Sequence, residues 1–86
     1  EWGIVSSVVA PDDLMTAANE LAARIAVNPP TALRMTKKLL KEGSSSTLAA
    51  LLEMSASLQA LVHQTKDHQE AVAAMLEKRP PNFTGE

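Results

Sequence analysis

Four stretches of helix-forming sequence alternate with helix-breaking residues, and this punctuation limits the possible folds more than any other feature of the chain. Pro29-Pro30 disfavours helical geometry at the residue before it and suits the first positions of a new helix. Gly43 begins a polar connection, and Pro80-Pro81 ends the last stretch. Alanine, leucine and methionine dominate between these breaks, and the aromatic residues typical of strands are rare. We therefore predict an all-α fold of about four helices.

Apolar residues within each stretch recur three or four positions apart, as on one buried face of a helix. Asn28 and Thr65 are the kinds of residue that cap a helix start, so we expect them to open the second and fourth helices. The expected helices run from Pro11 to about residue 28, from there to about residue 42, from about residue 47, and from residue 66 until Pro80. Residues 82–85 should trail behind as a tail.

The third of these helices is apolar on nearly all sides. One face carries Leu48, Leu51, Leu52, Ser55, Leu58 and Val62, and Ala49, Ala50, Met54, Ala56 and Leu61 broaden it. A helix of this kind is usually buried on more than one side. Because so few helices are available within the chain, the pattern predicts a partner surface outside it.

The segment before the first helix is short and β-branched. Gly3-Ile4-Val5-Ser6-Ser7-Val8-Val9 reads as an extended segment, and a lone strand cannot satisfy its own hydrogen-bonding groups. We therefore expect it to pack against, or pair with, further protein. The chain opens at Glu1 without a methionine, which we interpret as a fragment, a processed product or an excised piece of a longer protein.

Composition argues against several classes of protein. A formal net charge of −2 and a pI of about 5.6 disfavour a nucleic-acid partner. The chain has no cysteine for disulfides or thiolate zinc sites, and no apolar run approaches the length of a membrane span. No signal peptide is visible. These features predict a cytoplasmic protein that binds neither nucleic acid nor a membrane.

The residues alone suggest no catalytic or metal site. His63 and His68 are five apart, so on a continuous helix they point in different directions. The acidic residues are scattered, and no glycine-rich phosphate loop or nucleophile elbow is present. Arg34, Lys37, Lys38 and Lys41 share one helix face. We favour a solvent-exposed face for these four cations, and the alternative is a surface that binds anionic groups such as phosphates.

The order of several segments nevertheless resembles one family, the enoyl-CoA hydratase/isomerase (crotonase) superfamily, in its C-terminal part. The likeness spans essentially all 86 residues, and the ordered set carries it better than any single motif. The segments are Gly3-Ile4-Val5 with Val8-Val9, Asn28-Pro29-Pro30 with Ala32 and Thr36-Lys37, Asp67 with Glu70, and Glu77-Lys78-Arg79-Pro80-Pro81-Asn82-Phe83.

This resemblance implies that the active site belongs to an N-terminal core that the chain lacks. In the family, two backbone N–H groups of that core form an oxyanion hole for an acyl-CoA thioester, and hydratases add two acidic residues. Residues 1–10 would then link to the core, and residues 11–86 would be the C-terminal helical region. The region would cover the acyl-CoA site and join subunits into homotrimers or hexamers. No catalytic residue is assigned, and no cofactor beyond the coenzyme A of the substrate.

The resemblance also implies one contact with coenzyme A. Family members carry a Phe-x-x-Lys pattern near the chain end, beside a CoA site, and here the pattern reads Met75-Leu76-Glu77-Lys78. Lys78 is the candidate for a CoA phosphate, and Met75 can pack against the ligand in place of the aromatic residue. Hydration of a 2-enoyl-CoA in fatty acid metabolism is the expected reaction of the parent protein. The alternative is a non-enzymatic helical interaction module.

Overall fold

The computed structural model describes residues 2–86, in which the helices follow the breaks in the sequence. A single turn of 3-10 helix, η1 (Pro11–Asp13), leads into the first α-helix. The α-helices are α1 (Leu14–Ala26), α2 (Pro30–Glu42), α3 (Leu48–Val62) and α4 (Lys66–Glu77). No strand is formed among residues 2–86. The predicted all-α fold of about four helices is confirmed.

Side-chain caps fix two of the helix starts. The Ala50 N–H donates to Thr47 Oγ1 at 3.2 Å, and the His68 N–H donates to Thr65 Oγ1 at 3.1 Å. Each bond satisfies an amide that the helix itself leaves unpaired. Thr65 therefore caps α4 as predicted.

The role predicted for Asn28 is wrong. Its side-chain amide donates to the carbonyl oxygens of Arg24 at 3.4 Å and Ile25 at 3.0 Å. Asn28 thus closes the end of α1, whose last carbonyls have no partner within the helix. The next helix has no side-chain cap, and Pro30 stands in its first turn, where its missing N–H costs no bond within the helix.

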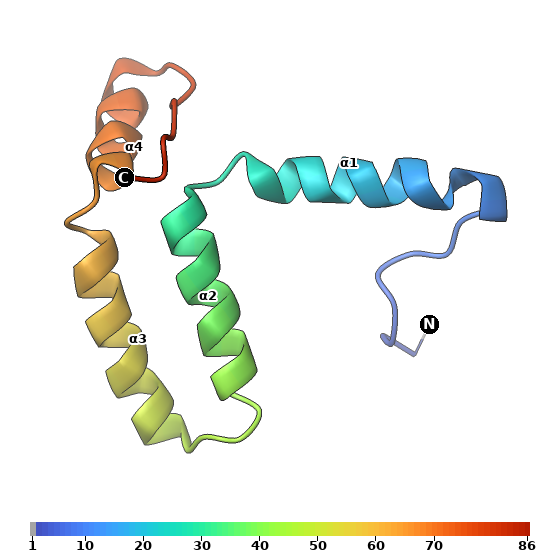
Figure 1. Ribbon diagram of the computed structural model, residues 1–86, viewed down its shortest axis with the longest axis horizontal. Helices are drawn as coiled ribbons and strands as arrows, with labels where there is room; N and C mark the ends of the chain where they lie inside the picture. Colours follow the sequence, from blue (N-terminus) through green and yellow to red (C-terminus); the bar gives the residue numbers. More distant parts are fainter. Residues whose placement is uncertain (1) are drawn as a thin grey trace.

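The helices are spread out in a thin arrangement (Figure 1). Helices α2 and α3 lie side by side, α1 reaches away from them, and α4 stands beyond the end of α3. Gly43 at the end of α2 lies close to α3: a Cβ atom at this position would lie 3.2 Å from Leu51 Cδ2 and from the Leu39 carbonyl oxygen, so a larger residue would require these neighbours to shift slightly.

The chain has almost no core of its own. Its radius of gyration is 16.4 Å, whereas a compact chain of this length has about 12 Å. Ala74 is the one hydrophobic residue fully buried among residues 2–86. The expectation of a buried face on α1 is wrong within this chain, because no other helix covers it: Leu21 is 46% exposed and Ile25 50%. The apolar faces remain available for other protein.

The N-terminal segment forms no strand within the described residues. Residues 3–6 form a bend, with Gly3 at a φ of 69°, and residues 7–10 have no regular structure. Glu1 lies outside the described residues. A link from residues 1–10 to an N-terminal core therefore stays a prediction. No helix among residues 2–86 combines the length and apolar character that crossing a bilayer requires.

Candidate functional site

The end of α4 adopts a tight turn that places Lys78 in an uncommon backbone conformation. Lys78 has φ 54° and ψ 40°, in the left-handed region. Its N–H donates to the Met75 carbonyl at 3.3 Å, and the Arg79 N–H donates to the Ala74 carbonyl at 3.0 Å. This pair of bonds defines a Schellman motif, in which glycine usually holds the left-handed position. A side chain there costs about 1 kcal/mol, so backbone preference alone would favour glycine at this position.

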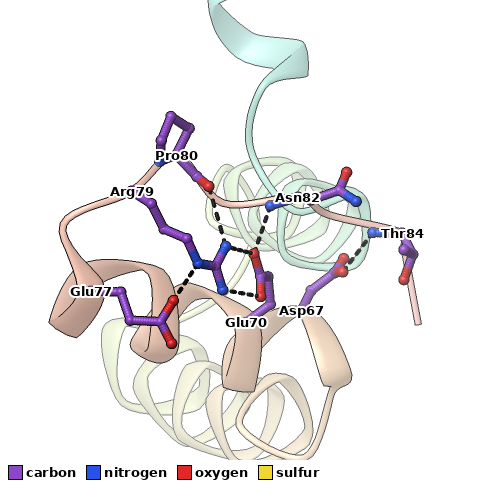
Figure 2. Close-up of polar contacts among 7 residues, drawn as sticks. All are labelled: Asp67, Glu70, Glu77, Arg79, Pro80, Asn82 and Thr84. Carbon is purple, nitrogen blue, oxygen red and sulfur yellow. Dashed lines mark hydrogen bonds and ion pairs between the residues drawn. The ribbon is translucent and has the colours of Figure 1, made fainter.

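Arg79 ties the turn back to the body of α4 (Figure 2). Its Nη1 and Nη2 donate to the two carboxylate oxygens of Glu70 at 2.6 and 2.9 Å, and its Nε donates to Glu77 Oε2 at 2.6 Å. The Asn82 N–H donates to Glu70 Oε1 at 2.8 Å. A bidentate guanidinium–carboxylate pair fixes direction as well as distance. Glu70 therefore holds both the Arg79 side chain and the backbone three residues further on.

These contacts shift the acidity of Glu70. The hydrogen bond from Arg79, helped by the Asn82 N–H, lowers the pKa of the Glu70 carboxyl from 4.5 to about 2. The same contacts with Glu70 and Glu77 raise the pKa of Arg79 above its usual value. Both groups are thus held in their charged forms.

A pH dependence follows from the lowered pKa. A carboxylate of this kind stabilises the folded state fully above its unfolded pKa, and the contribution is lost as the pH falls through the folded pKa. For Glu70 the loss should fall between about pH 4.5 and pH 2. In an NMR titration, the Glu70 carboxyl carbon should have its midpoint near pH 2, and Arg79→Gln should move the midpoint up towards 4.5. Equal midpoints in the two proteins would show that Arg79 does not control Glu70.

Asp67 fastens the end of the chain to α4. It is only 2% exposed, and its carboxylate accepts the Thr84 N–H at 2.7 Å and the Gly85 N–H at 2.9 Å (Figure 2 shows the Thr84 contact). The Asp67 N–H in turn donates to the Glu86 carbonyl at 3.1 Å. Thr31 at the start of α2 also donates to the Gly85 carbonyl, at 3.3 Å. The expectation of a trailing tail is wrong, because this buried carboxylate holds it.

The two residues predicted to meet coenzyme A lie on the last turn of α4 and beyond it. Met75 is 70% exposed, and Lys78 is also exposed. The ion pairs among residues 2–86 are Lys66–Glu86, Arg79–Glu70 and Arg79–Glu77, so none of them involves Lys78. Its ammonium group is thus available, and the predicted contact with a CoA phosphate stays a prediction.

The basic stripe of α2 (Arg34, Lys37, Lys38 and Lys41) is exposed along its length. Arg34 Nη2 donates to Thr31 Oγ1 at 3.0 Å, and none of the four cations enters an ion pair among residues 2–86. This arrangement agrees with a solvent-exposed face, the interpretation that we favoured from the sequence.

The structure brings together the two histidines that a continuous helix would separate. Helix α3 ends at Val62 and α4 begins at Lys66, and across this break the rings of His63 and His68 stack with centroids 4.5 Å apart. Both rings line an open groove between α2 and α3. No group of three or more potential metal ligands of the His, Cys, Asp or Glu type occurs in the described part of the chain.

Comparison with known proteins identifies the family. The sequence matches the family described as enoyl-CoA hydratase/isomerase over residues 1–86, and the chain therefore belongs to it. A 1,2-epoxyphenylacetyl-CoA isomerase of Escherichia coli K12 is 34% identical over 85 residues, which make up 99% of this chain and 32% of that protein. A 2,3-dehydroadipyl-CoA hydratase of the same strain is 35% identical over 83 residues, or 96% of this chain and 32% of that protein.

Solved structures show the same fold. An enoyl-CoA hydratase from Bacillus anthracis matches with a TM-score of 0.90 and 37% identity, across 98% of this chain and 33% of that one. A structure from Geobacillus kaustophilus described as an enoyl-CoA hydratase subunit matches with a TM-score of 0.88 and 37% identity, again across 98% and 33%. The chain thus spans about a third of the length of these relatives. The predicted family and fold class are confirmed.

Proposed function

We propose that this chain serves as the helical C-terminal region of an enzyme that acts on acyl-CoA thioesters. In this role its helices cover the acyl-CoA site and join neighbouring subunits into trimers or hexamers. The family match along the whole chain supports this proposal, as do the uncovered apolar faces of α1 and α3. A core domain and neighbouring subunits would cover the apolar surface that the chain leaves exposed.

Hydration of a 2-enoyl-CoA is the reaction that we propose for the whole protein. Relatives described as hydratases support it, including the E. coli 2,3-dehydroadipyl-CoA hydratase. The assay is the loss of the conjugated enoyl thioester's ultraviolet absorbance, with the protein expressed from its complete natural reading frame. If the double bond moves without uptake of water, the reaction belongs to the isomerase branch of the family instead.

Lys78 is the residue that we propose to contact coenzyme A. Its backbone has a left-handed conformation that glycine would adopt more easily, and its ammonium group has no carboxylate partner among residues 2–86. A residue kept at a conformational cost is a candidate for function. We therefore assign the Lys78 ammonium to a phosphate of coenzyme A, with the exposed Met75 packed beside the ligand.

Replacement of Lys78 tests this assignment. Lys78→Ala should weaken binding of coenzyme A about tenfold in calorimetric titrations, because one charge-assisted contact to phosphate is lost. Lys78→Gly should weaken binding equally while it raises the unfolding free energy by about 1 kcal/mol, since glycine accepts the left-handed conformation. Lys41→Ala, on the exposed stripe of α2, is the matched control and should leave binding unchanged. Unchanged affinity in both Lys78 variants would remove Lys78 from the site.

The second candidate function is a helical interaction module without catalytic activity. The observation that favours it is the extent of apolar surface on α3, where Leu48 and Leu52 are mostly exposed. A module of this kind should bind a protein partner through α3 and should show no affinity for coenzyme A. Binding of coenzyme A that Lys78→Ala weakens would decide against it.

A further inference from the structure

Both neighbours of Lys78 are held by ion pairs, whereas Lys78 itself forms none with the described residues 2–86. Glu77 receives Arg79 Nε at 2.6 Å, and Glu70 receives Arg79 Nη1 and Nη2. The single guanidinium therefore occupies the two carboxylates of α4 that lie closest to the turn (Figure 2). Either carboxylate, if unpaired, would compete with an anionic ligand for the cations of this turn. Arg79 satisfies them and leaves the Lys78 ammonium for another anion.

The chain beyond Lys78 closes into a short, stiff loop. Arg79 and Asn82 both bond to the Glu70 carboxylate, the first through its side chain and the second through its N–H. Pro80 and Pro81 lie between them, and proline rings restrict the backbone. Arg79 Nη1 also donates to the Pro80 carbonyl at 3.3 Å. Glu70 thus holds both ends of the loop that follows Lys78. Because the loop is fixed, the backbone conformation of Lys78 is restricted as well.

We infer that Glu70 and Arg79 are positioning residues for Lys78, which hold its side chain ready for a phosphate of coenzyme A. This inference rests on the proposed function of Lys78. Neither residue need touch the ligand. Their contribution is to fix the turn before binding, so that less side-chain and backbone freedom is lost when the phosphate arrives. Arg79 also keeps Glu70 and Glu77 neutralised, so that the phosphate does not meet two unpaired carboxylates.

A double-mutant cycle tests the inference in the protein expressed from its complete reading frame. Coenzyme A is titrated into the unmodified protein, Glu70→Gln, Lys78→Ala and the double variant. Glu70→Gln retains the size of the side chain and one acceptor for the Asn82 N–H, but it removes the charge. It should weaken binding about fivefold when Lys78 is present and should have no effect when residue 78 is alanine. The matched control is Glu20→Gln, which should leave binding unchanged because Glu20 is an exposed acid of α1 that forms no ion pair within residues 2–86.

The outcomes separate this inference from the proposed function. If Lys78→Ala weakens binding and Glu70→Gln does not, the positioning role is overturned while the assignment of Lys78 stands. Equal losses from Glu70→Gln in both backgrounds would show a general structural effect, which also overturns it. No effect of Lys78→Ala overturns the assignment of Lys78 itself. If circular dichroism shows that Glu70→Gln does not fold, Arg79→Lys replaces it in the same double-mutant cycle. Arg79→Lys keeps the charge but loses the bidentate geometry.

Discussion

Asp67→Asn should lower the unfolding free energy by about 3 kcal/mol and release the end of the chain. The carboxylate is buried and accepts two backbone N–H groups, from Thr84 and Gly85. A hydrogen bond to a charged group contributes about 1.5–3 kcal/mol, and an amide would face one of these N–H groups with a donor of its own. Denaturant unfolding measures the loss, and faster hydrogen exchange at Thr84 and Gly85 locates it.

The control for this change is Asp13→Asn in the turn before α1. Asp13 is exposed, and its side chain makes no cap hydrogen bond to α1. The same loss of charge should therefore cost about 0.5 kcal/mol or less, from the weaker interaction with the helix dipole. Equal effects of the two substitutions would mean that Asp67 does not fasten the tail.

The 86-residue chain on its own should self-associate at micromolar concentrations. Large apolar side chains are exposed on every α-helix, among them Leu14, Leu40, Leu52, Leu61 and Leu76. Apolar surface of this extent is unusual on a monomer. Covering a single leucine contributes about 1.5–3 kcal/mol, so several such contacts outweigh the cost of association. Light scattering should show a mean mass that rises across a concentration series.

Substitution on α3 makes this prediction specific. Leu52→Glu should weaken the association about tenfold, because it removes an exposed leucine and adds a charge. Ser57→Glu adds the same charge at an exposed polar position of the same helix and should have a much smaller effect. A constant monomeric mass across the series would contradict the prediction that these faces need a covering surface.

Much of the secondary structure was predictable because its signals are local. Gly43 directly follows the last residue of α2, and the Thr65 side chain reaches only three residues ahead to cap α4. Helix α4 ends at Glu77, three residues before Pro80. Asn28 was misassigned because the same side chain can cap the helix that follows or close the one before. Pro30 supplied its own start for α2, which left the Asn28 amide to bond the carbonyls of α1.

The contacts that build the candidate site join residues that are far apart in the sequence. Asp67 contacts Thr84 and Gly85 only because the chain turns back after Pro81. The periodicity of apolar residues in the sequence does not predict such a reversal. Residues 82–85 were therefore predicted to trail as a tail. The pairing of Glu70 with Arg79 across nine positions was missed for the same reason. Lys78 was found only through the resemblance to the family.

The match to known relatives does not distinguish between the reactions described for them. Two E. coli relatives at 34% and 35% identity are described as an isomerase and a hydratase. The chain matches both almost equally, although the two proteins are described as catalysing different reactions. Residues that select the reaction are therefore expected in the two thirds of those proteins that this chain does not cover.

The most direct test of the account is a crystal structure, with an acyl-CoA bound, of the protein expressed from its complete reading frame. We predict that the Lys78 ammonium lies within about 4 Å of a phosphate oxygen, an ion-pair distance, while Arg79 remains on Glu70. The apolar faces of α1 and α3 should be covered by other protein. A coenzyme A bound far from Lys78, with those faces still open to solvent, would contradict both the assigned contact and the proposed place of these helices.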